Sequence, residues 1–276
     1  MRKLSVDDPQ SCHEPCVDES KEQPGEAHWQ TIGKVARLFV RGPKDPSARP
    51  QSSLQLIKDF GAVGDRHASP RSPRQLLIAG QPAYDRLKLP SNTLRENLLV
   101  DVSTDDLNSG DLLAIGPDVV LWLTFQCEPC SLLERRSPGV LRSMGSSRGV
   151  LARVVRGGTL TQGDQMRYSR SAIPAMSGKW QARVIRVLHA MPSDCCISYR
   201  QLAELAGVAT AYCRAFPRLL STLPSDIAGR AQSGLAHTRS SSWEGAELFD
   251  VSAHLDRVLR PSGSTMSETV PPAACA

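Results

Sequence analysis

Two cysteines at CxxC spacing, Cys127 and Cys130, are the residues whose types and spacing most clearly permit chemistry. They follow an apolar run, residues 119–123, that predicts a buried strand, and Pro129 ends that strand. Loops held by a rigid scaffold often carry chemistry. Four interpretations are open at this point: a metal site, a redox pair, a single reactive thiol, or two core cysteines, because cysteine is often buried.

Zinc is the first metal to consider. Cys12, His13 and Cys16 could join the CxxC pair as ligands across a long intervening segment. The paired-knuckle spacing of a zinc ribbon is absent, so we interpret these three residues as surface side chains. A thioredoxin-like redox motif would need a βαβ unit around it, which the sequence does not predict.

Three further clusters contain charged or polar side chains, and two of the three also contain glycines. They cover residues 61–67, residues 94–100 and residues 148–164, and the second is the one without glycine. Each also has a purely structural interpretation. The first can be a turn capped by Asp65, the second a solvated strand start, and the third a set of hairpin turns.

Short apolar runs separated by glycines fill residues 31–170 and predict a β-rich domain, either a barrel or a sandwich. The expected strands cover residues 35–40, 54–58, 74–78, 96–100, 111–115, 119–125, 151–155 and 164–168. Residues 82–87 and 129–136 could each hold a short helix.

In their order along residues 35–170, these motifs resemble the MOSC domain, the family named after the C-terminal domain of molybdenum-cofactor sulfurase. The matching motifs are Gly61-x-x-Gly64-Asp65-Arg66-His67, Arg74-Gln75-Leu76-Leu77, Arg95-Glu96-Asn97-Leu98, Gly110-Asp111, Ile115-Gly116, Cys127-Glu128-Pro129-Cys130, Arg148-Gly149, Gly158 and Gly163-Asp164. The resemblance implies a barrel-like fold that binds molybdenum cofactor or handles its sulfur.

The family's characteristic cysteine maps to Cys130, which the resemblance implies is a molybdenum ligand or a carrier of persulfide sulfur. A thiolate is a soft ligand suited to such a metal, and neighbouring cations lower a thiol's pKa. Cys127 is expected to help as a resolving thiol, whereas the carboxylate of Glu128 opposes thiolate formation.

The cofactor-binding residues implied by the resemblance are Asp65, Arg66, His67, Arg74, Arg95 and Asn97. The basic groups would favour the thiolate and hold the pterin's phosphate through charge-assisted hydrogen bonds, and Asn97 would fix a polar edge. The expected cofactor is therefore molybdenum cofactor (molybdopterin), and the expected partner is a molybdoenzyme or a sulfur donor.

One departure from the full sulfurase concerns its pyridoxal-phosphate desulfurase domain. Residues 1–30 leave no room for that domain, so we expect this chain not to mobilise sulfur from cysteine by itself. We find no lysine context that would extend the family's association with pyridoxal phosphate to this chain.

The second part of the chain, residues 179–260, has a helical texture and follows an expected linker at residues 171–178. Apolar residues recur at helical spacing over residues 180–191. Ser198 and Gln201 form a capping box for the next helix, and Gly207 supplies its left-handed stop. A third helix is expected after Thr210, which together with the second makes a helix-turn-helix pattern.

This part resembles the DNA-binding half of alkylguanine-DNA alkyltransferases, a winged-helix-like domain. The matching residues are 184–192, 197–199, 201–203, 206–207 and 214–215. Tyr199 and Arg214 map to the residues that assist nucleotide flipping in that family. The family's nucleophilic cysteine is missing downstream, which excludes alkyl transfer by its mechanism. Pro217 interrupts the expected recognition helix, at a cost of about 3 kcal/mol for an interior proline. The alternative function is therefore non-catalytic binding of DNA or an alkylated base.

Composition sets the broad class. The chain has 276 residues, 40% hydrophobic content and a net charge of +5, which are values of a globular protein that permits but does not require an anionic partner. We expect no membrane association and no signal peptide, hence a cytoplasmic location in which the eight cysteines are thiols or ligands. Residues 1–30 and 261–276 are expected to be a disordered leader and tail.

Overall fold

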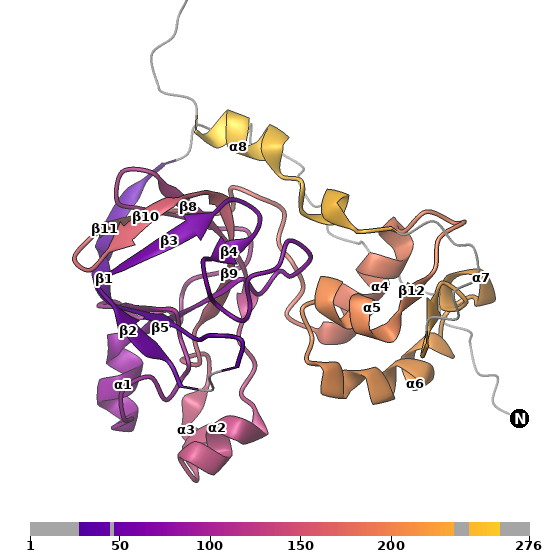
Figure 1. Cartoon of the computed structure of the whole chain (residues 1–276), viewed down its shortest axis with the longest axis horizontal. Coiled ribbons are helices and arrows are strands. Elements are labelled where there is room, and N and C mark those ends of the chain that lie inside the picture. The colour runs from indigo at the N-terminus through magenta and orange to yellow at the C-terminus, as the bar shows by residue number, and fades with distance from the viewer. Residues whose placement is uncertain (1–27, 45–46, 235–242, 260–276) are drawn as a thin grey trace, which may run out of the picture.

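The computed structural model describes residues 28–44, 47–234 and 243–259. Figure 1 shows a barrel of strands beside a group of short helices, with the last helix, α8 (Ser252–Val258), lying along the barrel. Most of the predicted leader and all of the predicted tail lie outside the described residues. Residues 28–30 of the leader are described, and the first strand begins at Gln30.

Seven strands close into a barrel in the order β1-β11-β7-β8-β9-β5-β6, since β6 pairs with β1 and β1 with β11. Their bounds are β1 (Gln30–Val40), β5 (Leu76–Gly80), β6 (Leu98–Val100), β7 (Leu112–Ile115), β8 (Val119–Gln126), β9 (Val150–Arg156) and β11 (Gln165–Ser169). All pairs are antiparallel except β5 with β6, which α1 (Gln81–Leu87) helps to connect. The barrel alternative is therefore confirmed over the sandwich.

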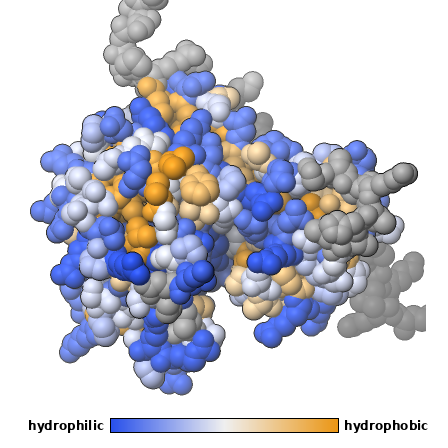
Figure 2. Space-filling model, viewed as in Figure 1, coloured by the Kyte–Doolittle hydropathy of each residue, from blue (hydrophilic) through white to orange (hydrophobic). Residues whose placement is uncertain are grey.

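Shorter elements complete this part of the molecule. Strand β2 (Arg49–Gln51) pairs with β1, and β10 (Gly158–Thr161), β3 (Ser53–Ile57) and β4 (Gly61–Ala62) form a separate sheet. Figure 2 shows hydrophobic surface on the viewed face of the barrel. The large apolar side chains that stay exposed in the described chain are Ile57, Phe60 and Val63, next to β3 and β4.

Strand β8 is buried on both faces, which explains its uninterrupted apolar sequence. Leu121 and Leu123 belong to the cluster inside the barrel. Val120 and Trp122 alternate with them and belong to a second cluster, which the barrel shares with the helices. The strand that leads to the CxxC segment is thus fixed by two cores at once.

Helices α2 (Ser131–Arg136) and α3 (Val140–Met144) follow β8 and lie at one end of the barrel near α1 (Figure 1). Their apolar residues form a third cluster with α1 and with β1, β5 and β6. The short helix predicted at residues 129–136 is confirmed from Ser131 onward, whereas α3 was not expected.

The helical part begins with α4 (Trp180–Ala190) and contains β12 (Ile197–Ser198), α5 (Tyr199–Leu205), η1 (Thr210–Ala215), α6 (Phe216–Leu220), α7 (Ser225–Ala228), β13 (Ala231–Gln232) and η2 (Ala246–Phe249). The predicted capping box of Ser198 and Gln201 is confirmed by both of its hydrogen bonds. The predicted third helix is a 3₁₀ turn followed by α6, with Pro217 in the first turn of α6. Within the described ranges, no helix is long and apolar enough to span a membrane.

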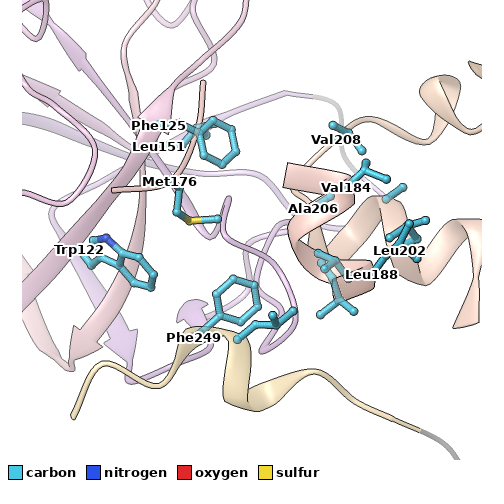
Figure 3. Packing of buried hydrophobic residues seen from close by; sticks show 14 of the residues in the cluster. Trp122, Phe125, Leu151, Met176, Val184, Leu188, Leu202, Ala206, Val208 and Phe249 are labelled. Carbon is cyan, nitrogen blue, oxygen red and sulfur yellow. The ribbon is translucent and has the colours of Figure 1, made fainter. Parts of the chain in front are cut away.

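The two parts share one hydrophobic core (Figure 3). This core contains Trp122, Phe125 and Leu151 of the barrel together with Val184 and Leu202 of the helices. The segment predicted as a linker takes part in this packing. Met176 is buried there, and its backbone N–H donates to Ser109 Oγ at 2.6 Å.

Candidate thiol and anion pocket

A pocket of about 160 Å³ opens where the CxxC segment leaves strand β8. It gathers residues that lie far apart in the sequence. Its lining consists of Arg41, His67, Arg74, Leu76, Leu77, Arg95, Asn97, Cys127, Cys130, Arg148 and Leu151. Six of the predicted site residues therefore meet at one cavity, whereas Asp65 and Arg66 are not among its walls.

The two cysteines differ in their surroundings. Cys127 is 5% exposed, its backbone N–H donates to Gly149 O at 2.8 Å, and Arg74 Nη2 donates to its sulfur at 3.8 Å. Cys130 is exposed and stands at the N-cap of α2 in an extended conformation. The pocket thus offers one buried thiol beside a guanidinium and one accessible thiol.

Asp65 organises the pocket from behind. Its carboxylate accepts hydrogen bonds from the backbone N–H groups of Arg41 and His67, at 3.0 and 2.8 Å, and from Asn97 Nδ2 at 2.8 Å. Because the carboxylate is buried and fully engaged, it positions three wall residues. Arg66 is exposed, and its backbone N–H donates to Arg41 O at 2.7 Å.

The Asn97 side chain is also used inside the protein. Its Oδ1 accepts from Leu77 N at 3.1 Å, and its Nδ2 donates to Asp65 and, at 3.3 Å, to Phe39 O. It lies in the pocket wall, but these partners occupy both ends of its amide. The geometry supports a role in joining β1, β5 and the residue 61–67 turn.

Four arginines surround the pocket, and no carboxylate stands among the described residues that line it. Arg41 and Arg148 are almost completely buried, with guanidinium groups anchored on the carbonyls of Arg95 at 2.9 Å and Leu94 at 2.6 Å. Burial and the charge of Arg95 lower the pKa of Arg41 to about 10. Burial and neighbouring arginines likewise lower the pKa of Arg95. This concentration of cations would be relieved by an anion.

Two of these arginines carry unsatisfied donors. The Nε atoms of Arg95 and Arg148 are buried and have no hydrogen-bond partner in the described structure. A buried unsatisfied donor costs about 1–3 kcal/mol, and more when it is charged. A bound anion is the simplest group that would satisfy such donors.

His67 adds a neutral group to this positive wall. Partial desolvation at the pocket and the charge of Arg41 lower the pKa of His67 to about 4, against the opposing effect of Asp65, although the residue is exposed. The imidazole is therefore uncharged at pH 7 and offers both a donor and an acceptor.

Residues 74–167 match the family profile of the MOSC domain. The segment that carries the two pocket cysteines is therefore similar to the MOSC domain. The match runs from Arg74, just ahead of β5, to Arg167 in β11, and so includes the CxxC segment and most of the barrel. A comparison with curated proteins gave no match.

Solved structures similar to this chain have low sequence identity. The YUAD protein from Bacillus subtilis is 19% identical with a TM-score of 0.43, and the alignment covers 51% of this chain and 98% of that one. YiiM from Escherichia coli is 18% identical with a TM-score of 0.41, over 72% and 98% of the two chains. YiiM from Geobacillus stearothermophilus is 13% identical with a TM-score of 0.38, over 70% and 99%.

Two of the arginines that line the MOSC pocket, Arg41 and Arg148, were not predicted from the sequence. Arg148 stands in a motif that supported the family resemblance, next to Gly149. That glycine has φ +101°, and a Cβ there would come within 2.4 Å of Ile78 O, so the chain passes close to β5 at this point. The signal for Arg41 was its place directly after the first predicted strand.

The residues predicted to contact DNA lie in the helical part, outside the MOSC pocket. Tyr199 is half-buried and packs edge-on against Phe216, with 5.5 Å between ring centroids. Arg214 is exposed on the 3₁₀ turn η1. Cys12, His13 and Cys16 fall outside the described residues, within which no group of three or more histidine, cysteine or acidic side chains could hold a metal ion.

Proposed function

We propose that the MOSC pocket binds molybdenum cofactor, or handles its sulfur, through Cys130. One observation carries the proposal: an accessible thiol opens onto a cavity with four arginine walls, two of which keep unsatisfied buried donors. The family is associated with molybdenum-cofactor biology, and both halves of such a ligand, a soft metal and an anionic phosphate, find matching groups here.

The residues would divide the ligand between them. Cys130 would hold the metal or carry the sulfur, with Cys127 as its helper, and Arg41, Arg95 and Arg148 would hold the phosphate. When bound, the cofactor would supply a redox-active metal or a transferable sulfur. The cavity is smaller than the usual 300–1,000 Å³ of ligand pockets, so it would enclose one end of the cofactor beside the exposed Cys130.

Pterin, molybdenum and sulfur analysis of the purified wild-type chain tests the proposal. The chain should be produced in cells that make the cofactor. We expect bound molybdenum with pterin, or a cyanolysable sulfur, at a fixed ratio to protein. A chain that carries none of the three would overturn both versions of the proposal, and a chain with sulfur alone would support sulfur handling.

A second candidate is DNA or alkylated-base binding by the helical part acting as a winged-helix-like module. The favouring observation is that Arg200, Arg214 and Arg218 are all exposed. Against it, Tyr199 is held by Phe216, and Pro217 opens a new helix where a recognition helix should continue. Fluorescence anisotropy with plain and alkylated duplexes tests it. Affinity should fall steeply with salt and be lost in Tyr199→Ala with Arg214→Ala.

A further inference from the structure

Arg183 of α4 is enclosed between the helical part and the barrel, with 1% of its surface exposed. Its Nε donates to Ala206 O at 2.9 Å, and its Nη1 donates to the carbonyls of Ser177 and Gly178 at 3.0 and 2.8 Å. These bonds fix the guanidinium rigidly to the helical part and to the segment that leads into it.

The remaining contacts of Arg183 reach the thiol segment on both sides of Cys127. Its guanidinium lies 3.7 Å from the ring centroid of Phe125, and its Nη2 lies 3.3 Å from Glu128 Oε1. A cation–π contact is stronger when it is desolvated. Removal of one partner of a buried ion pair is costly, because it leaves the other charge without compensation. Arg183 therefore contacts one residue on each side of Cys127 in the chain.

A second contact joins the same partners. Arg74 donates from Nη1 to Gly207 O at 3.1 Å and from Nη2 to the sulfur of Cys127 at 3.8 Å. Gly207 approaches so closely that an added Cβ would lie 2.5 Å from Pro73 and 2.8 Å from Phe125. The helical part is thus seated directly behind the pocket wall that holds the buried thiol.

We infer that Arg183 is a positioning residue for residues 125–130, and that the helical part is through it a structural component of the thiol pocket. The further consequence, that Arg183 holds Cys130 in place for a cofactor, rests on the proposed function. The positioning of residues 125–130 by Arg183 does not depend on that function. Arginine is required because a lysine ammonium can pair with Glu128 but cannot bond three carbonyls and stack on Phe125 together.

The test is the alkylation rate of each cysteine by iodoacetamide in the full chain, at one fixed pH, followed by mass spectrometry. In Arg183→Met, which keeps a long apolar side chain over Phe125, the rate at Cys127 should rise by about tenfold or more, because the segment opens locally. Cys195, also 5% exposed but in the helical part, should keep its wild-type rate. Arg183→Lys should restore part of the protection.

Arg186→Met is the matched control. Arg186 lies on the same helix and also donates to a carbonyl, that of Leu248 at 3.1 Å, but among the described residues it has no hydrogen bond or ion pair with residues 125–130. The alkylation rate of Cys127 in Arg186→Met should equal the rate in the wild-type chain. An unchanged Cys127 rate in Arg183→Met, or an equal rise in Arg186→Met, would overturn the inference.

Glu128→Ala covers the case in which Arg183→Met unfolds and exposes Cys195 as well. It removes the anchor on the barrel side and leaves α4 intact. We expect faster alkylation at Cys127 with Cys195 unchanged, and protection of Cys127 at the wild-type level would count against the inference. Because the alkylation test needs no cofactor, a wild-type chain that carries no molybdenum, no pterin and no cyanolysable sulfur would refute the proposed function without affecting this result.

Discussion

At the scale of single residues, three neighbours show how one motif serves three purposes. Arg95, with φ +62°, turns toward the pocket. Glu96 is 1% exposed and its Oε2 accepts from Tyr84 OH at 2.6 Å. Asn97 joins Asp65 to the barrel. The left-handed backbone at Arg95 breaks the alternation of an extended chain, which lets consecutive side chains reach such different places.

Replacement of Glu96 tests its burial. Desolvation raises the pKa of Glu96 above its ordinary 4.5, only partly offset by the Tyr84 hydrogen bond. The folded state therefore retains the proton longer than the unfolded chain, and the contribution of Glu96 to stability falls as pH rises above about 4.5. Glu96→Gln should gain in unfolding free energy relative to wild type between pH 4.5 and 7, by at most about 1.4 kcal/mol per pH unit.

Urea unfolding of both proteins across this pH range gives the difference. Parallel curves for Glu96→Gln and wild type would show that Glu96 is not held in a raised-pKa environment.

The sequence motifs predicted many of the side chains that line the pocket, but not the hydrogen bonds that hold those side chains in place. Cys127, Cys130, His67, Arg74, Arg95 and Asn97 do meet at one cavity. The inward roles of Asp65 and Asn97 depend on hydrogen bonds across more than one strand, which no local pattern encodes. Arg41 and Arg148 were missed because arginine side chains are mostly exposed, so the sequence gives no reason to expect these two to be buried. The predictions for cofactor contacts stay predictions.

At the scale of elements, each of the eight predicted strands overlaps an observed one, whereas β2, β4, β10, β12 and β13 were not predicted. Strand β2 was missed because all three of its residues are exposed and one is Pro50. Strand β1 begins earlier than expected, at Gln30, because its polar start pairs with β11, with Gln30 opposite Tyr168. Such pairings are set by tertiary structure and leave little trace in local sequence.

The capping box of α5 is a local device whose energy can be measured alone. Ser198 Oγ accepts from Gln201 N at 3.2 Å, and Gln201 Oε1 accepts from Ser198 N at 3.1 Å. Ser198→Ala should lower the unfolding free energy by about 1 kcal/mol, since an N-terminal donor loses its partner. Ser193→Ala, at an exposed position in the preceding turn, should change it by less than about 0.5 kcal/mol. Equal effects in urea unfolding would argue against the cap.

At the scale of the whole molecule, strand β8 and the helices share one core, so barrel and helical part are expected to unfold together. The sequence suggested two units separated by a linker at residues 171–178. The packing of Ile173 and Met176 ties that segment to the barrel instead of leaving it in solvent. The interface was hidden from sequence reasoning because the same apolar residues suit either an isolated core or a shared one.

Gly207 tests the closeness of this docking. Gly207→Ala combines a left-handed φ of +63° with contacts at 2.5 and 2.8 Å to the barrel. Gly139→Ala is the matched control, since Gly139 has φ +83° and nothing within 4 Å of the added Cβ. Both should pay about 1–2 kcal/mol of backbone strain, and Gly207→Ala a further 1–3 kcal/mol or so for the collision. Equal losses in urea unfolding would mean that the parts are not in close contact there.

The central claim, that Cys130 holds the molybdenum cofactor or its sulfur, is tested most directly by comparing Cys130→Ser with Cys213→Ser. Cys213 is a half-buried cysteine of the helical part, away from the pocket. Molybdenum, pterin and cyanolysable sulfur are to be measured per chain in both variants and in wild type. We predict wild-type amounts in Cys213→Ser and complete loss of the metal, or of the sulfur, in Cys130→Ser. Retention at the wild-type level in Cys130→Ser would contradict the account.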